Sequence, residues 1–254
     1  MTIKVGVVGA AGGMGTATCA AVDRADDLEL VVRIGRGDDL ARLLASRADV
    51  AVDFTHPDAV LGTVETCVAA GIHVVVGTSG LGKPDLDAVR AMLDGAPAVG
   101  VVVAPNFSVG AVLMMQMAAQ AAPHFTSVEI VELHRDTKPD VPSGTAMRTA
   151  EMVAAARSDA GVAPSPDATS HGRLEARGAD VDGVRVHAVR LRGLLAHQEV
   201  LLGSDGEVLT IRHDSLDRSS FMPGVLLAVR SVRSRPGLTV GLEHLLDLSP
   251  PAAG

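Results

Sequence analysis

The sequence predicts an α/β protein in which a Rossmann-type, doubly wound parallel sheet is combined with an inserted α+β domain. Three observations support this fold class. Short β-branched runs alternate with alanine-rich stretches through the first hundred residues, and a glycine-rich turn follows the first run. Beyond residue 106 the pattern changes, and Asp-Gly dipeptides, which are typical of hairpins, lie between or before apolar runs.

Five apolar runs in the first hundred residues are expected to be strands, because each is short, β-branched and separated from the next by a helical pattern. Nearly continuous apolar strands between helices indicate a parallel sheet that is covered on both faces. The expected strands are Ile3–Val8, Leu28–Val32, Val50–Phe54, His73–Val76 and Val99–Val103.

The first strand leads directly into a glycine-rich turn at residues 9–15, and an alanine-rich helical stretch follows. A dinucleotide pyrophosphate has to approach backbone N–H groups at the positive end of a helix, and a Cβ at the glycine positions would keep it away. Glycines also form ordinary turns, but the flanking strand and helix favour a nucleotide site.

After Pro105-Asn106, a methionine-containing helix is expected to lead into a second sheet. The Asp-Gly dipeptides at 182–183 and 205–206 predict hairpins, so this sheet should be mixed or antiparallel. The stretch Gly161–Gly183 is predicted to be a long excursion. The expected elements are the strands Val128–Leu133, Val184–Leu191, Glu199–Leu202 and Val208–Arg212, a helix from Gly144, a helix over Ser219–Arg233, and a last stretch, Leu238–Leu248, that returns to the first domain.

Composition argues against several classes of function. The formal net charge of −8 argues against nucleic acid and acidic membrane surfaces as partners. The most apolar stretch is broken by Pro105, Asn106 and Ser108, so no membrane span is predicted. The chain has no Trp or Tyr to stack on bases. Cys19 and Cys67 are expected to be reduced core residues of a cytoplasmic protein, and no signal peptide is expected.

The end of the second expected strand bears on the choice between the two nicotinamide dinucleotides. An acidic residue there binds the ribose hydroxyls of NAD, whereas an arginine accommodates the 2′-phosphate of NADP. Here Arg33 and Arg36 flank the strand end, and Asp38-Asp39 follows later. We therefore expect NADPH to be preferred over NADH, with Arg36 on the phosphate. The alternative is that both arginines are solvated surface charges.

A second concentration of polar residues lies between the strand at 128–133 and the following helix. His134 titrates near neutrality and is the natural proton donor of this segment. On its own, the segment can equally be an ordinary strand-to-helix loop. The groups that can hold carboxylates are Arg135, Lys138 and the N–H groups of Ser143, Gly144 and Thr145 at the helix start.

Two other interpretations of this segment are rejected. His134-Arg135-Asp136 matches the start of a kinase catalytic loop, but Val141 stands where that loop needs Asn, and the nucleotide turn is of the wrong kind. The nine histidines show no paired metal spacing, so no metal site is predicted.

Taken together, these segments resemble the family of 4-hydroxy-tetrahydrodipicolinate reductases (dihydrodipicolinate reductases) over nearly the full length of the chain. The most specific motif is E-L-H-x-x-x-K-x-D-x-P-S-G-T-A at 132–146. The other motifs are G-A-A-G-G-M-G at 9–15, D-F-T-H-P at 53–57, G-T-S-G at 77–80 and A-P-N-F-S-V-G at 104–110.

The resemblance implies an NAD(P)H-dependent enzyme of the diaminopimelate and lysine pathway, which reduces 4-hydroxy-tetrahydrodipicolinate to tetrahydrodipicolinate. It implies a dinucleotide-binding domain over residues 1–106 and 218–254. An inserted domain over residues 107–217 would bind the dicarboxylate substrate and form a homotetramer.

The resemblance also implies roles for single residues. His134 would be the proton donor and Lys138 the lysine that anchors the substrate, both catalytic, and Gly144 and Thr145 would bind a substrate carboxylate. Arg135 and Ser143 are added to the substrate-binding residues on the basis of charge and position alone. The implied cofactor-binding residues are Gly9, Gly12, Met14 and Gly15 at the pyrophosphate, Gly77, Thr78, Ala104, Asn106 and Phe107 at the nicotinamide, and in addition Ala10, Gly13, Arg36, Asp53 and Phe54.

The chain departs from the family at one position of the longest motif. The family usually has a second histidine directly after the first, and here Arg135 stands in its place. An arginine keeps the positive charge and can bind a carboxylate, but it cannot relay a proton at neutral pH. Reduction of the family substrate is the favoured interpretation. A reductase of another imino or amino acid, and a nucleotide-binding homologue that has lost catalysis, stay open as alternatives.

Overall fold

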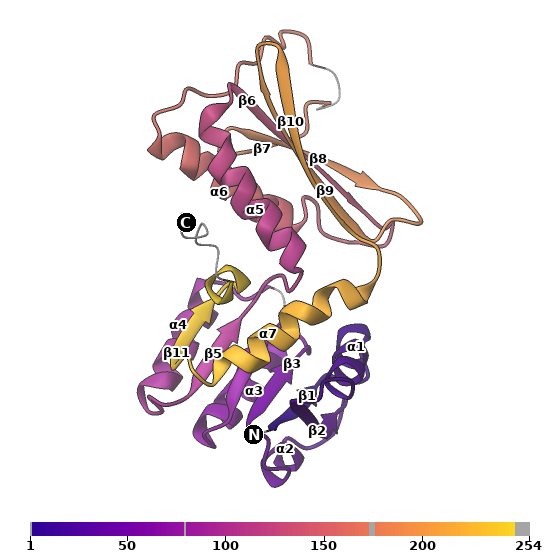
Figure 1. Ribbon diagram of the computed structural model, residues 1–254, viewed down its shortest axis with the longest axis vertical. Coiled ribbons are helices and arrows are strands. Elements are labelled where there is room, and N and C mark those ends of the chain that lie inside the picture. The colour runs from indigo at the N-terminus through magenta and orange to yellow at the C-terminus, as the bar shows by residue number, and fades with distance from the viewer. Residues whose placement is uncertain (1, 79, 173–175, 247–254) are drawn as a thin grey trace, which may run out of the picture. The chain divides into compact units, whose positions relative to one another are not determined.

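The computed structural model describes residues 2–78, 80–172 and 176–246 (Figure 1). The chain divides into two compact units. The first consists of the residues up to Val109 together with those from Arg218 onward, and the second is Gly110–Asp217. The second unit is therefore an insertion into the sequence of the first. Ser79, residues 173–175 of the expected excursion and the end of the stretch expected at 238–248 lie outside the described residues.

The first unit is built on a six-stranded parallel sheet with the strand order β11-β5-β4-β3-β1-β2. The five strands expected in the first hundred residues are all present, which confirms the parallel α/β fold. The second strand continues two residues further than expected, and the third ends at Asp53 instead of Phe54. The strands are β1 (Ile3–Val8), β2 (Leu28–Ile34), β3 (Val50–Asp53), β4 (His73–Val76), β5 (Gly100–Val103) and β11 (Gly237–Val240).

Helices cover both faces of this sheet, because its central strands are apolar on both sides. All four residues of β3 are buried, as are all four of β5. Helix α7 packs against β3, β4 and β5 and also against α1, whereas α3 packs against β3, β4 and α4. The helices are α1 (Gly13–Val22), α2 (Ala41–Ala45), α3 (Pro57–Ala69), α4 (Lys83–Asp94) and α7 (Met222–Val232), with 3-10 turns η2 (Arg218–Phe221) and η3 (Leu242–Leu245).

The last part of the chain returns to the first unit. The helix expected over 219–233 is divided into η2 and α7, and Pro223 lies in the first turn of α7, where its missing N–H costs no hydrogen bond. Strand β11 then pairs in parallel with β5, with Gly237 opposite Gly100 and Val240 opposite Val103.

The second unit is built on a mixed five-stranded sheet with the strand order β10-β9-β6-β8-β7. Strands β6 and β8 run parallel, and the other pairs are antiparallel, as the sequence predicted. The residues Asp182-Gly183 and Asp205-Gly206 connect the two expected hairpins, with positive φ angles at Asp182, Gly183 and Gly206. The strands are β6 (Ser127–His134), β7 (Ala179–Val181), β8 (Val184–Arg190), β9 (Ala196–Ser204) and β10 (Glu207–Ser215).

Two helices and one face of the mixed sheet form the core of the second unit. Helix α5 (Val109–Ala121) continues into the 3-10 turn η1 (Ala122–His124), and α6 (Gly144–Asp159) follows β6. Ala118 and Ala150, from the two helices, lie in one apolar cluster with Val128 and Ile130 of β6. Alternate residues of β6 are therefore buried, as expected for a strand with one covered face.

The excursion expected over Gly161–Gly183 is partly wrong, because β7 lies within it. Residues 162–172 form no helix or strand, as expected. Cys19 in α1 and Cys67 in α3 are both buried and unpaired, as expected of reduced core cysteines, and burial raises the pKa of the Cys67 thiol to about 12. None of the helices that the structure describes has the length and apolar character needed to cross a membrane.

Candidate active site

The predicted cofactor residues follow the carboxyl ends of neighbouring parallel strands. The last residues of four strands are in register: Val8 pairs with Asp53, Asp53 with Val76, and Val76 with Val103. The turn at 9–15 and the segments that begin at 54, 77 and 104 therefore leave the sheet at one common edge. This edge of an open parallel sheet is where ligands bind in α/β proteins.

The glycine turn folds closely upon itself. Gly9 has a φ of +79°, and a Cβ there would overlap the carbonyl of Phe54. A Cβ at Gly15 would overlap the carbonyl of Gly9. Both glycines are thus required by the packing of the turn on the protein itself, whatever ligand the turn holds.

Backbone N–H groups of the turn fall into two sets. Those of Gly9 and Ala10 donate to the Ile34 carbonyl at 2.9 and 3.0 Å. Helix α1 begins at Gly13, and the first bond that returns to the N-cap Gly12 is donated by Thr16, at 2.8 Å. The N–H groups of the first turn of α1, which include those of Gly13, Met14 and Gly15, are therefore the ones directed toward an anion.

Two aromatic rings cross beside the end of β4. Phe54 and Phe107 meet edge to face, with ring centroids 5.8 Å apart. A Cβ at Gly77 would overlap both rings, so only glycine fits between them. The rings and Gly77 bring three of the predicted cofactor segments into direct contact.

Asp53 lies inside the protein and connects two of these segments. Its Oδ1 accepts hydrogen bonds from the Thr78 hydroxyl at 2.9 Å and from the N–H and hydroxyl of Thr55 at 2.9 and 2.7 Å. Asp53 Oδ2 is buried and has no hydrogen-bond partner among the described residues. Asn106 caps its own loop, because its Oδ1 accepts from Ser108 N–H at 2.8 Å, and Ala104 N–H donates to Val76 at 3.0 Å.

The two arginines at the end of β2 differ in their contacts. Arg33 donates to Asp23 at 2.8 Å, whereas Arg36 is exposed and its guanidinium has no hydrogen-bond or ion-pair partner in the part of the chain that the structure describes. Asp38, the nearest following carboxylate, accepts from Gly35 N–H at 2.7 Å and pairs with Arg42. The Gly35 hydrogen bond holds the pKa of Asp38 below its usual range.

Arg218 is a further cation at the glycine turn, and it was not predicted from the sequence. Its Cζ and Nε lie 3.2 Å from the point where a Cβ on Gly13 would stand. Arg218 is exposed, and its guanidinium has no hydrogen-bond or ion-pair partner within residues 2–78, 80–172 and 176–246. No local pattern indicates this contact, because more than two hundred residues separate the two positions in the sequence.

In the second unit, His134 is the last residue of β6 and is held by a buried carboxylate. His134 Nδ1 forms a short hydrogen bond with Oε2 of Glu132, whose side chain has no exposed surface. The bond fixes the ring and leaves Nε2 as the nitrogen that can act on a ligand. Burial alone would raise the pKa of Glu132, but the hydrogen bonds from His134 and Arg190 lower it to about 2.

Lys138 lies in the loop between β6 and α6 and is paired with Asp140. Its Nζ donates to Oδ1 and Oδ2 at 2.7 and 2.8 Å. Burial alone would raise the pKa of Asp140, but the hydrogen bonds from Lys138 and the backbone, together with the charges of Lys138 and Arg190, hold this pKa below its usual range. Arg135 in the same loop is exposed, and its guanidinium has no partner among the residues described. This loop therefore presents one paired and one unpaired cation.

Helix α6 begins beside these groups. Ser143 is the N-cap, and its hydroxyl accepts from Ala146 N–H at 3.2 Å. The N–H of Ser143 itself donates to Glu132 at 3.1 Å, so it is not directed at a ligand. The N–H of Gly144 is in the first turn, and a Cβ at this position would meet no atom within 4 Å. Gly144 thus leaves open space at the positive end of α6.

The predicted substrate residues are gathered at one end of the second unit. Glu132 and Arg190, which hydrogen-bond to groups of this segment, were not predicted as part of the site. The signal for Glu132 is its place in β6, since the alternation that buries Val128 and Ile130 also buries residue 132.

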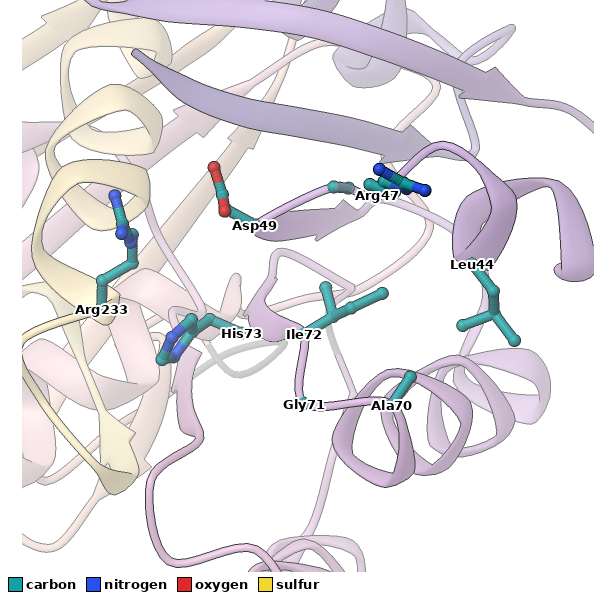
Figure 2. A pocket seen from close by; sticks show the side chains of 9 residues that line it. Leu44, Arg47, Asp49, Ala70, Gly71, Ile72, His73 and Arg233 are labelled. Atoms are coloured by element: carbon teal, nitrogen blue, oxygen red, sulfur yellow. The ribbon is translucent and has the colours of Figure 1, made fainter. Parts of the chain in front are cut away.

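A pocket in the first unit lies at the opposite edge of its sheet, where β3 and β4 begin (Figure 2). Its lining includes Asp49, which accepts from Lys4 N–H at 2.8 Å, and His73, whose Nδ1 accepts from Gly100 N–H at 2.9 Å. These bonds hold the amino ends of the strands. The glycine turn follows the carboxyl end of β1, so this pocket is separate from the predicted cofactor site.

Comparison with known proteins covers both units. Residues 3–107 match the family model described as the N-terminus of dihydrodipicolinate reductase, and residues 110–246 match the model of its C-terminus. The chain is 61% identical to the 4-hydroxy-tetrahydrodipicolinate reductase of Nocardia farcinica, over 98% of this chain and 100% of that protein. It is 58% identical to that of Streptomyces coelicolor, over 97% and 99% of the two chains.

Solved structures agree with these matches. A dipicolinate-bound dihydrodipicolinate reductase from Paenisporosarcina sp. TG-14 is 36% identical and superposes with a TM-score of 0.85, covering 97% of this chain and 100% of that one. A probable dehydrogenase from Thermotoga maritima superposes with a TM-score of 0.63 at 12% identity, over 96% and 92% of the two chains. This second likeness concerns the fold alone.

Proposed function

Because this chain belongs to the dihydrodipicolinate reductase family, we propose that His134 is its proton donor and that the start of α6 binds a carboxylate of its substrate. The reaction is the NAD(P)H-dependent reduction of 4-hydroxy-tetrahydrodipicolinate in the diaminopimelate and lysine pathway. One observation carries the assignment of residues: Glu132 is hydrogen-bonded both to His134 and to the N–H of Ser143 at the start of α6. The same buried carboxylate thus holds both groups.

The substrate is a small dicarboxylate, and the second unit offers several groups of the right charge. The first-turn N–H groups of α6, at Gly144 and Thr145, would bind one carboxylate, as helix N-termini do. Lys138 and Arg135 would bind and orient the dianion, Arg135 through its planar guanidinium. The solved Paenisporosarcina reductase holds dipicolinate, which has the same pair of carboxylates, and this supports the assignment.

The nicotinamide cofactor, when bound, supplies the hydride, and the 4-hydroxyl group of the substrate leaves as water before or during the reduction. The protein's own part is to hold the dianion against fixed cations, which contributes both binding and orientation. His134 donates the proton from Nε2 to the nitrogen-bearing part of the ring, since its Nδ1 is directed at Glu132. The ionised carboxylate of Glu132 is held directly against the imidazole from which this proton comes.

The residues of the first unit fit a dinucleotide. The first-turn N–H groups of α1 and the guanidinium of Arg218 would hold the pyrophosphate, and Gly9, Gly12 and Gly15 allow the close turn. The nicotinamide would lie near the crossed rings of Phe54 and Phe107, with Gly77, Thr78, Ala104 and Asn106 around it. Asp53 supports this pocket from inside through Thr78.

NADPH is the preferred cofactor in this proposal. Arg36 has no partner of its own and stands just beyond the end of β2, where the adenosine ribose of a bound dinucleotide lies in proteins of this fold. Asp38 is engaged by Gly35 and Arg42, so it is not available to bind ribose hydroxyls. NADH would still bind through the pyrophosphate and nicotinamide contacts.

A cytoplasmic homotetramer that associates through the second unit is also part of the proposal. In β6, buried and half-buried residues alternate, because the apolar core of the second unit covers only one face of the sheet. Val208, Leu209 and Val189 are exposed apolar residues of β10 and β8. Association of several copies would cover such residues. Light scattering at several protein concentrations tests this state.

The activity is tested by coupling the protein to a dihydrodipicolinate synthase, which supplies the unstable substrate, and by following the absorbance of NADPH. Rapid, synthase-dependent oxidation of NADPH is the expected result. Oxidation only with a different cyclic imine or amino acid would identify a related reductase. Normal binding of NADPH without oxidation by any of these substrates would identify an inactive nucleotide-binding homologue.

A further inference from the structure

We propose that Glu132 and Arg190 act as one positioning unit, which fixes the proton donor, the start of α6 and the loop of Lys138 relative to one another. The inference rests on the proposed roles of His134, Lys138 and α6, and it adds two residues that touch neither substrate nor cofactor.

The Glu132 carboxylate is the centre of this unit. Its Oε1 accepts from Ser143 N–H at 3.1 Å and from Arg190 Nη2 at 2.8 Å, and its Oε2 accepts from Arg190 Nη1 at 2.8 Å and bonds with His134 Nδ1. The donors come from β6, β8 and the N-cap of α6. Glu132 has no exposed side-chain surface, so it acts only through the groups that it holds.

Arg190 extends the unit to the loop. Its Nη2 also donates to the carbonyl of Asp140 at 2.7 Å, and Asp140 is the residue whose carboxylate pairs with Lys138. Arg190 lies opposite His134 in the parallel pairing of β6 and β8. One guanidinium therefore connects the carboxylate beneath His134 with the backbone of the Lys138 loop.

The charges of the unit are permanent at physiological pH. The pKa of Glu132 is about 2, because hydrogen bonds from His134 and Arg190 outweigh its burial. The hydrogen bonds with Glu132 raise the pKa of Arg190 further above its already high value. A bidentate pair between two groups that stay ionised gives a fixed geometry, which is what an oriented proton donor and a preorganised anion site require.

The same strand carries a matched control. Glu129 also bonds with a histidine and an arginine, since it accepts from Arg177 and contacts His187 Nε2 at 2.7 Å. Among the described residues, the side-chain partners of Glu129 are Arg177 and His187, which lie neither at the start of α6 nor among the proposed site residues. Glu129→Gln therefore removes a comparable carboxylate from the same strand without touching the proposed site.

The first test compares Glu132→Gln with Glu129→Gln in the full-length protein. The amide keeps the size of the side chain but removes the charge, so Glu132→Gln should lower kcat by about 10- to 100-fold, by analogy with carboxylates that orient metal-binding histidines. It should leave the Kd of NADPH within about twofold, because the cofactor residues belong to the other unit. Glu129→Gln should keep kcat, and its melting temperature shows what loss of a strand carboxylate does to stability alone.

The second test uses chemical rescue, which a purely structural role would not show. Arg190→Ala should lower kcat and raise the KM of the substrate. Guanidinium ions, added far below denaturing concentrations, should restore part of kcat by occupying the place of the lost side chain. Arg190→Lys should retain more activity than Arg190→Ala but less than the native protein, because an ammonium cannot form the bidentate pair. Arg192→Ala removes an exposed arginine two residues further along the chain and serves as the control. It should keep the native kcat and KM, and guanidinium ions should not change either value.

Two results would overturn the inference: a folded Glu132→Gln protein with native kcat, or an Arg190→Ala protein whose loss guanidinium ions do not relieve. Both are distinct from failure of the proposed function. If the proposed function itself were wrong, the native protein would not oxidise NADPH with the synthase-supplied substrate, and His134→Gln would cause no further loss of activity.

Discussion

The guanidinium of Arg218 lies against Gly13, with its Cζ and Nε 3.2 Å from the point where a side chain at position 13 would begin. Gly13 leaves room for an arginine from a distant part of the sequence, whereas Gly9 and Gly15 are required by the packing of the turn itself. The contact puts a positive charge beside the N–H groups of the first turn of α1.

Substitution of Arg218 or Gly13 should weaken the binding of NADH and NADPH equally, because both cofactors contain the pyrophosphate. Arg218→Ala removes a charge-assisted contact of about 1.5–3 kcal/mol, which corresponds to about 10- to 100-fold in Kd. Gly13→Ala should have a smaller effect in the same direction, since the methyl group displaces the guanidinium. Titration of NAD(P)H fluorescence measures both affinities. A loss confined to NADPH would instead place Arg218 at the 2′-phosphate.

Arg36 should distinguish the two cofactors. Arg36→Ala is expected to raise the Kd of NADPH by about 10- to 100-fold and to leave that of NADH nearly unchanged, because only NADPH carries the phosphate. Arg33→Ala is the matched control, since Arg33 is already paired with Asp23 and should favour neither cofactor. Equal losses for both cofactors in Arg36→Ala would mean that this arginine supports the structure of the loop.

Local patterns predicted most of the first unit, because its buried strands are short β-branched runs that end in recognisable turns. Strand β7 was not predicted, because it lacks these features. It has three residues, two of them exposed, within a stretch rich in polar residues. Its pairing with β8 is specified by the Asp182-Gly183 turn, which the sequence did show.

The site was predictable only where its residues are close in sequence. His134, Lys138 and the start of α6 fall within one motif. Arg190 lies more than forty residues beyond this motif and reaches the site through the pairing of β6 with β8, which no periodicity predicts. Glu132 belongs to this motif, but its role could not be predicted, because a carboxylate in a strand ordinarily faces solvent. Its burial becomes intelligible once its four hydrogen bonds are seen.

The pair between Lys138 and Asp140 should compete with the substrate. Lys138→Ala is expected to raise KM and lower kcat together, without changing the affinity for NADPH. Asp140→Asn should free the lysine and tighten binding of dipicolinate by up to about fivefold, since an exposed pair of this kind contributes about 0–1 kcal/mol. Calorimetric titration with dipicolinate measures the second effect. Weaker binding by Asp140→Asn would show that the aspartate orients the lysine.

Glu132 should make stability depend on pH in the acid range. The pKa of Glu132 in the folded protein, about 2, lies below the pKa of about 4.3 expected in the unfolded chain. The contribution of Glu132 to the free energy of unfolding is therefore fully present above about pH 4.3. The contribution should be lost as the pH falls toward 2. Denaturation by urea, followed for the native protein and Glu132→Gln, should therefore show a difference in stability at pH 7 that narrows below about pH 4. A difference independent of pH would contradict the assigned pKa.

The substitution at position 135 separates reduction of the family substrate from a changed specificity. If the guanidinium of Arg135 only binds a carboxylate, Arg135→His should alter kcat by no more than about tenfold, or about 1.4 kcal/mol. His134→Gln should cost far more, about 10²- to 10⁴-fold, because it removes the proton donor. The native protein and both variants are assayed side by side with synthase-supplied substrate. A native protein that is nearly silent but gains activity with histidine at position 135 would mean that this arginine has redirected the site to a different imine or amino acid.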